Sequence, residues 1–183
     1  MKKILSVVFL VLLSVSLMSI SYAAELKVGD KVGDFKLGAA LGDKDYGLNS
    51  PEFAGKVVYV VYASSSSADD NDHVSEALKA DKEVQRLEKE KKYVGLGIGN
   101  QKDSPVPNFI IKQIAKRKQQ KTGAIILLDP EFTIGNLWGT PHKVATSILI
   151  DKQRIVRYVY SGKTPAENIP KLIELIKKYS EEK

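Results

Sequence analysis

The stretch 48–64 reads LNSPEFAGKVVYVVYAS, and its second half decides the fold. Residues 56–62 (KVVYVVY) form a nearly continuous apolar, β-branched run, which predicts a strand that is covered on both faces. After four serines, apolar residues recur at three- and four-residue spacing from Val74 to Leu87, which predicts one helix through Lys91. A buried strand followed by a helix is the basic unit of a sheet with helices packed on its faces.

The rest of the chain continues to alternate between strand and helix patterns. We expect further elements at 93–98 (strand), 109–120 (helix), 124–128 (strand), 133–138 (short helical turn), 146–150 with 155–160 (hairpin) and 165–179 (helix). Residues 28–37 carry two Gly-Asp pairs and form a turn-rich lead-in. Because no repeat or long linker divides the chain, we expect one α/β sandwich with a mixed central sheet flanked by helices.

The composition limits the chemistry that the protein can perform. The chain has 183 residues, of which 28 are Lys or Arg and 22 are Asp or Glu, and it contains no cysteine. Its length supports one domain of ordinary size with its own hydrophobic core. A sequence without cysteine excludes disulfides, thiolate metal sites, thiol redox chemistry and a cysteine nucleophile.

The first 23 residues have the pattern of a signal peptide. Two lysines precede an apolar run over residues 4–20, and residues 21–23 (SYA) supply the small side chains of a cleavage site. An uncleaved anchor is the alternative, but the run is only as long as the shortest spanning helices and no basic stop-transfer cluster follows it. We therefore expect cleavage after Ala23, and an exported domain of residues 24–183 with no stable membrane anchor. Loss of the two lysines lowers the formal net charge from +6 to +4.

Four stretches of the chain resemble one group of proteins. Residues 28–37 (VGDKVGDFKL) and 48–64 are similar to the opening of the TlpA, ResA and peroxiredoxin group of thioredoxin-like proteins. Residues 125–139 (IILLDPEFTIGNLWG) resemble the central strand and short helix of that group, and residues 145–178 resemble its closing hairpin and helix. The resemblance implies a thioredoxin-like sandwich over nearly all of the mature chain.

The sequence departs from this group at the residues that carry its chemistry. Where those enzymes have Trp-Cys-x-x-Cys, residues 65–69 read SSSAD, so that Ser66 and Asp69 stand at the two cysteine positions. A serine cannot take part in disulfide exchange, which proceeds through a thiolate. Ala145 replaces the cis-proline that faces the cysteines. We expect a trans bond between Val144 and Ala145, because a non-proline cis bond costs about 2.5–4 kcal/mol.

Within this group the chain is similar to the YtfJ family of secreted thioredoxin-like proteins that lack the cysteine pair. The serine-rich stretch 64–68 and the strand at 145–151 (ATSILID) carry this resemblance. It implies a periplasmic location, and no established reaction or cofactor. We therefore expect a non-redox binding or accessory protein with no nucleic-acid partner, which binds a periplasmic protein, a peptide or a small ligand at the former redox site. The residues expected at this site are Ser65, Ser66, Ser67, Asp69, Trp138, His142 and Ala145.

Two enzyme hypotheses start from the same region. A hydrolase would pair Ser66 with His142 or His73, although no G-x-S-x-G motif is present. A metal-assisted enzyme would use the acids and the histidine after the serines, which are Asp69, Asp70, Asp72 and His73. The glycine and distal glutamate of an EF-hand loop are missing from this run. The simpler interpretation is that one of Ser66, Ser67 and Asp69 caps a helix with acids in its first turn.

Two further features each allow a binding role and a structural role. The basic residues near the helix at 109–120 would suit a binder of the anionic envelope surface, or form a solvated helix face. These basic residues are Lys112, Lys116, Arg117, Lys118 and Lys121. Trp138 would frame a shallow groove with Tyr62 and His142, or fill the core beneath its helical turn.

Mass spectrometry of the exported protein should show a polypeptide that begins at Ala24, because the residues before it match a signal-peptidase site. A mature protein that begins at Met1 would contradict the signal-peptide assignment.

Overall fold

The computed structural model describes residues 25–182, so the expected signal peptide, residues 1–23, lies outside the described part of the chain. The described residues form a seven-stranded mixed sheet in the order β2-β1-β5-β4-β3-β6-β7. Its strands are β1 (Leu37–Ala39), β2 (Asp45–Tyr46), β3 (Val57–Ser64), β4 (Tyr93–Asn100), β5 (Ile125–Asp129), β6 (Thr146–Ile150) and β7 (Val156–Ser161). This sheet confirms the expected α/β architecture.

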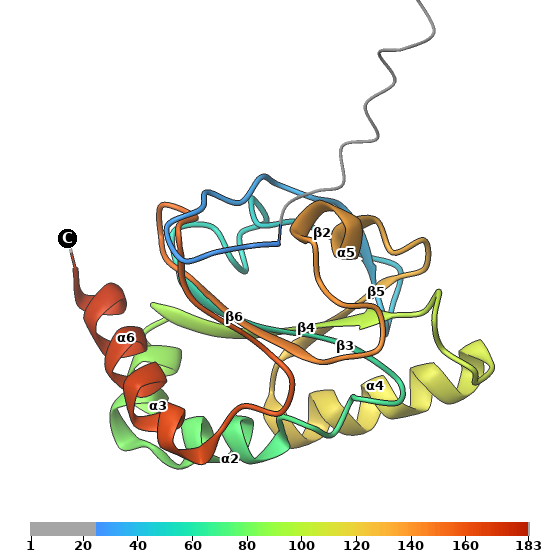
Figure 1. Ribbon diagram of the computed structural model, residues 1–183. Coiled ribbons are helices and arrows are strands. Elements are labelled where there is room, and N and C mark those ends of the chain that lie inside the picture. Colours follow the sequence, from blue (N-terminus) through green and yellow to red (C-terminus); the bar gives the residue numbers. More distant parts are fainter. Residues whose placement is uncertain (1–24, 183) are drawn as a thin grey trace, which may run out of the picture.

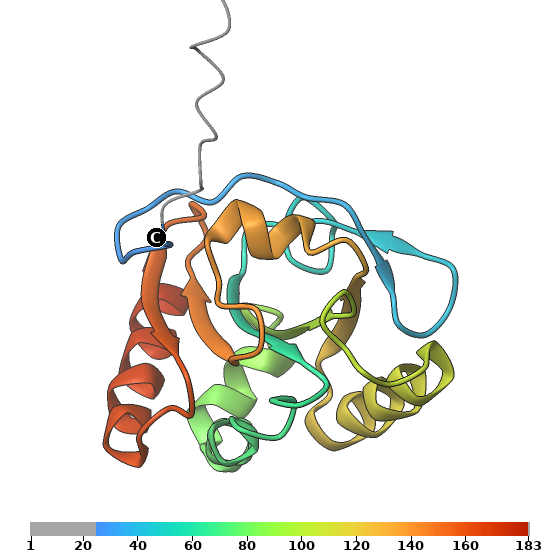
Figure 2. The ribbon, with the colours of Figure 1, turned by 45° about the vertical axis from the view of Figure 1, so that its right-hand side comes forward.

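Helices cover both faces of the sheet. They are α2 (Asp72–Ala80), α3 (Lys82–Lys89), α4 (Asn108–Thr122), α5 (Thr133–Trp138) and α6 (Ile169–Glu181), the last preceded by the 3₁₀ turn η1 (Ala166–Asn168). Figure 1 shows α2, α3, α4 and α6 on one face, and α5 with the N-terminal lead-in on the other. Figure 2 shows α6 and α4 at opposite edges of the helical layer. Within residues 25–182, no helix is long and apolar enough to cross a membrane.

Strand β3 is the centre of the sheet, as its apolar run predicts. It pairs in parallel with β4 and antiparallel with β6. Val58, Val60 and Tyr62 point into the core beneath α5, whereas Val57 and Tyr59 point into the core beneath α2, α3 and α6. The strand therefore needs apolar side chains at successive positions, because both of its faces are buried.

The strand directions bring several loops to one end of the sheet. β3, β4 and β5 are parallel, and their last residues, Ser64, Asn100 and Asp129, are partners in register. β6 runs the opposite way and begins with Thr146 opposite Tyr62. The loops after β3, β4 and β5 and the loop before β6 therefore meet, and we call this region the loop end of the sheet.

Two local expectations were wrong or incomplete. The single helix expected from Val74 through Lys91 is two helices, α2 and α3, which are separated at Asp81. Asp81 has extended backbone angles, and its Oδ1 accepts hydrogen bonds from the backbone N–H of Glu83 (2.9 Å) and Val84 (3.0 Å). This carboxylate caps α3. The segment that begins at the end of the lead-in also forms two strands, β1 and β2, which pair antiparallel with each other, and β1 extends the sheet beyond β5.

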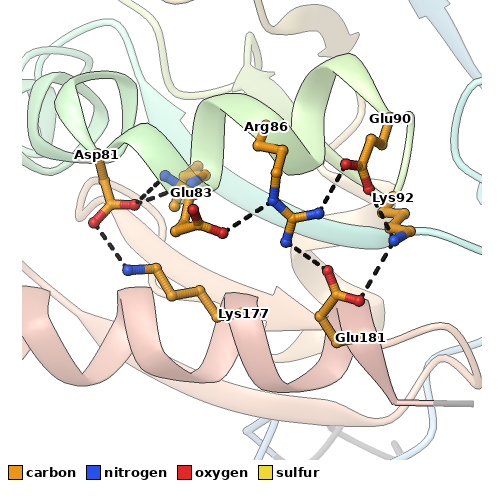
Figure 3. A network of polar contacts seen from close by, with 8 residues as sticks. Asp81, Glu83, Arg86, Glu90, Lys92, Lys177 and Glu181 are labelled. Atoms are coloured by element: carbon orange, nitrogen blue, oxygen red, sulfur yellow. Dashed lines mark hydrogen bonds and ion pairs between the residues drawn. The ribbon is translucent and has the colours of Figure 1, made fainter.

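Ion pairs connect α3 to α6 across the surface of the helical layer (Figure 3). Arg86 donates to Glu83 (2.9 Å), Glu90 (2.8 Å) and Glu181 (2.6 Å). Lys177 of α6 donates to Asp81 at 3.0 Å. Exposed pairs of this kind contribute little individually, so the cap at Asp81 is the stronger contribution to stability.

Asp81→Ala should lower the free energy of unfolding by about 1 kcal/mol, because α3 loses its cap. Asp81→Asn keeps a capping oxygen and loses only the pair with Lys177, so its cost should be about 0.3 kcal/mol. Urea-induced unfolding of both variants measures the difference. Equal losses would show that the ion pair, and not the cap, carries the effect.

The contribution of Asp81 to the free energy of unfolding should depend on pH in a defined direction. Desolvation pushes the pKa of Asp81 upward, but the bonds from the Val84 N–H and Lys177 outweigh it and hold the pKa below its ordinary value. A carboxyl whose pKa is lowered by folding stabilises the protein above its unfolded pKa. The difference between the wild type and Asp81→Ala should therefore shrink as the pH falls below about 4.

Candidate functional site

The serines after β3 form a compact turn at the loop end. The Ser67 hydroxyl accepts the Ser64 backbone N–H at 3.2 Å, and the hydroxyls of Ser64 and Ser66 lie 2.8 Å apart. Ser64 and Ser67 are buried, whereas Ser66 is exposed and Ser65 is half-buried. Of these side chains, Ser66 and Ser65 are the two that solvent or a partner can reach.

The expected helix cap in this region is wrong. α2 begins at Asp72, and its N-cap position is Asn71, which makes no side-chain cap bond. The Asn71 side chain instead accepts the Thr164 N–H at 2.8 Å and donates to the Gly162 carbonyl at 3.2 Å. His73 reaches the same segment, where Nε2–H donates to the Thr164 carbonyl at 2.7 Å. These bonds fix the serine turn to the segment after β7.

The acids after the serines bind lysines of α4. Asp69 contacts Lys118 at 2.6 Å, and Asp72 pairs with both Lys118 and Lys121, the latter at 2.9 Å. Desolvation raises the pKa of Asp72, but the two lysines outweigh it and lower the pKa overall. Lys121 also meets Glu76 at 2.8 Å. The basic surface of α4 is therefore partly neutralised, which corrects the picture of a fully solvated face.

The structure gives no support to a metal site in this run. Over residues 25–182, no three His, Asp or Glu side chains lie together as a metal site would require. Asp72 forms ion pairs with two lysines, and the His73 ring bonds a backbone carbonyl.

His142 forms a polar cluster with residues of the loop after β4. Its Nδ1 lies 2.7 Å from Oδ2 of Asp103, and the Asn100 side chain donates both to that oxygen (2.7 Å) and to the His142 carbonyl (2.9 Å). The bond from Asn100 and that from His142 lower the pKa of Asp103. Because an ionised carboxylate only accepts, Nδ1 of His142 carries the hydrogen of this bond.

Two further contacts complete this end of the sheet. The His142 ring stacks on Phe132, with centroids 4.0 Å apart and planes inclined by 25°. Ser104 donates to Ser65 at 2.7 Å and so joins the loops after β4 and β3. Asn100, Asp103 and Ser104 were not expected from the sequence, because the signal that links them to His142 and Ser65 is tertiary.

Three of the expected site residues are buried. Trp138 is 1% exposed and packs its edge against Phe35, with ring centroids 5.8 Å apart. Tyr62 is buried too, so the groove of Trp138, Tyr62 and His142 does not exist, and Trp138 fills the core. Ser67 and Ala145 are buried as well. No cis peptide bond occurs among the described residues, so the Val144–Ala145 bond is trans, as expected.

A buried carboxylate fixes the first turn of α5 at the loop end of the sheet. Asp129, the last residue of β5, accepts the Tyr62 hydroxyl at 2.9 Å. It also accepts the N–H groups of Thr133 (2.8 Å), Ile134 (2.8 Å) and Gly135 (3.2 Å), which are the orphan donors of the first turn of α5. Burial, followed by the charge of Asp129, raises the pKa of Tyr62, so the hydroxyl stays a donor.

Asp129→Ala should lower the free energy of unfolding by about 4 kcal/mol, because four donors, three of them buried, lose their acceptor. Tyr62→Phe removes one donor and leaves the carboxylate bonded to three N–H groups, so its cost should be about 1 kcal/mol. Urea-induced unfolding compares the two variants. A loss for Asp129→Ala no larger than that for Tyr62→Phe would contradict the role given to the carboxylate.

Solved structures with the same architecture belong to redox proteins. A protein assigned as a thiol:disulfide interchange protein DsbE from Chlorobium tepidum has a TM-score of 0.63 and 21% identity, over 85% of this chain and 99% of that one. Peroxidoxin BcpB from Mycobacterium tuberculosis has a TM-score of 0.59 and 18% identity, over 84% and 97%. A secreted thiol-disulfide isomerase from Corynebacterium glutamicum has a TM-score of 0.61 and 16% identity, over 90% and 95%. At these identities the likeness establishes the fold alone.

Comparison of the sequence with known proteins and families assigns the chain to a family. No curated protein matches the chain. A family model described as "Bacterial protein of unknown function (YtfJ_HI0045)" matches residues 30–179. The chain therefore belongs to the YtfJ_HI0045 family, and it has a thioredoxin-like fold without any cysteine.

Proposed function

We propose that the mature chain is a periplasmic, non-redox binding protein whose partner, a protein or a peptide, docks on the loop end of the sheet. The chain has no thiol with which to exchange disulfides. The fold of the redox proteins is nevertheless retained, together with an ordered set of loops where their chemistry takes place. A protein that keeps these loops but cannot carry out thiol-disulfide exchange is expected to act through binding.

The observation that carries this proposal is the mixture of exposed apolar and polar side chains at the loop end. Phe109, in the first turn of α4, is 63% exposed, and Val144, before β6, is 38% exposed. His142 and Ser66 are exposed at the same end. Aromatic and aliphatic side chains that solvent reaches, beside hydrogen-bonding groups, are typical of protein contact surfaces.

The loops of this surface are held before any partner arrives. The bonds of Asn71 to the segment after β7, of Asn100 to His142, and of Ser104 to Ser65 connect four loops. A surface that is already ordered loses little conformational entropy on binding. This order favours recognition of a defined partner.

One observation favours a hydrolase as the second candidate. Asp103 bonds Nδ1 of His142 as the acid of a catalytic triad bonds its histidine, and this bond orients the imidazole ring. In the described part of the chain, however, the serine hydroxyls of this end bond one another, and none bonds the His142 ring. The nucleophile–base bond that such an enzyme needs is therefore not formed.

The protein should be isolated from the periplasm of its own bacterium after mild crosslinking and analysed by native mass spectrometry. We expect the wild type to carry a protein or peptide adduct, and Phe109→Ser and His142→Ala to reduce the adduct at least fivefold, because both side chains face the partner. Lys112→Ala is the matched control on the exposed face of α4 and should keep the adduct.

Three outcomes would contradict the proposal. Equal adducts in all variants would place the partner elsewhere, and a selective loss in Lys112→Ala with strong salt dependence would indicate the envelope-surface binder instead. Ester or amide hydrolysis by the purified protein that disappears in both Ser66→Ala and His142→Ala would indicate the enzyme.

A further inference from the structure

A cavity lies between the sheet and the helices α2 and α4. Its volume is ≈ 140 Å³, and its walls come from β3, β4 and β5 on one side and from the two helices on the other. Apolar side chains form most of the wall: Val61, Ala63, Ile111, Ile114, Ala115, Ile126 and Leu128. The cavity is partly open to solvent, and an enclosed apolar cavity of about this volume, engineered in another protein, binds benzene.

Three glycines in β4 lie in the wall of the cavity and make room for side chains of β5. Gly95, Gly97 and Gly99 alternate along the strand and line the cavity, whereas Leu96 and Ile98 between them fill the core on the opposite face. Side chains of β5 lean over the glycines, since a Cβ on Gly97 would come within 2.5 Å of Ile126 Cδ1. None of these three glycines has a positive φ, so the backbone itself does not require glycine there. Their role is to leave room.

The cavity has one polar end without formal charge. Ser64, Ser65 and Ser104, with the amides of Asn71 and Asn100, line it at the loop end of the sheet. Of the charged residues in the wall, Lys118 pairs with Asp72, Lys79 donates to the Lys121 carbonyl at 2.8 Å, and Glu88 lies beside Gly123, at the end away from the serines. The Ser65 hydroxyl accepts from Ser104 and keeps its own hydrogen for a neutral polar group, whereas a carboxylate would meet Asp72 and Asp69 beside Lys118.

We propose that this cavity binds a small uncharged amphiphile: an aliphatic chain of about six carbon atoms, lying under α4, with a neutral polar group at the serine end. The volume sets the length, because about 150 Å³ holds the six carbons of benzene. Burial against the apolar wall provides most of the affinity, and the Ser65 hydroxyl orients the polar group of the ligand. This site is separate from the docking surface proposed above, which uses the exposed side chains of the loop end.

Isothermal titration calorimetry with 1-butanol, 1-hexanol and 1-decanol tests the proposal on the whole mature protein. Affinity should rise from 1-butanol to 1-hexanol and gain no more at 1-decanol, with a negative heat-capacity change from the burial of apolar surface. Hexanoate should bind at least fivefold more weakly than 1-hexanol. Absence of alkanol binding, steady gains through 1-decanol, or tighter binding of hexanoate would each overturn the proposal.

Two filled-cavity variants locate the binding. Gly97→Leu should weaken 1-hexanol at least tenfold, and Gly33→Leu is its matched control, because Gly33 lies on the surface with open space around its Cα. Ala115→Leu fills the cavity from the α4 wall and replaces Gly97→Leu if that variant does not fold. Equal affinity of the filled and control variants for 1-hexanol would contradict the assignment of the binding site to this cavity. Because Gly33, Gly97 and Ala115 lie outside the proposed docking surface, these substitutions should leave partner docking unchanged, and the two proposals therefore fail separately.

Discussion

The buried carboxylate of Asp129 is the constraint on which the loop end depends. A charge that is fully buried is tolerated only when donors surround it, and here four donors from β3 and α5 converge on it. The first turn of α5 is thereby fixed against the last residue of β5, and Phe132 between them takes a left-handed backbone (φ 59°). The Phe132 ring in turn stacks against the His142 ring. One buried acid thus connects the centre of the sheet to its exposed end.

The electrostatics of this end differ from those that a reactive thiol requires. A thiol is activated at a helix N-terminus, where the helix dipole lowers its pKa. Here Ser66 lies in a turn before α2, and the first turn of the helix carries Asp72, which is paired with lysines of α4. The side chains at this end bond one another and leave apolar and polar groups facing outward. Thiol chemistry is therefore not available at this end of the scaffold, and its outward-facing groups are those to which we assign the docking of a partner.

The sequence predicted most of the fold but only part of the site. The central strand, the hairpin and the last helix have local periodicity, and the structure places them within a few residues of their expected bounds. The sequence pattern does not reveal the break at Asp81. The apolar residues of both helices face the same core, so their spacing resembles that of one continuous helix; these residues are Val74, Leu78, Val84 and Leu87. The contacts Asp103–His142 and Asn71–Thr164 join residues far apart in the chain, and no local spacing encodes them. Trp138 was ambiguous because an indole suits both a core and a groove, and only the packing of α5 decides between them.

Site-specific photocrosslinking in the periplasm tests the central claim most directly. A photoreactive residue in place of Val144 lies on the loop end, whereas one in place of the exposed Gln153 lies in the turn after β6, at the opposite end of the sheet. We expect a discrete crosslinked partner from position 144 and none from position 153. Crosslinks of equal yield from both positions, or a partner seen only from position 153, would contradict this expectation.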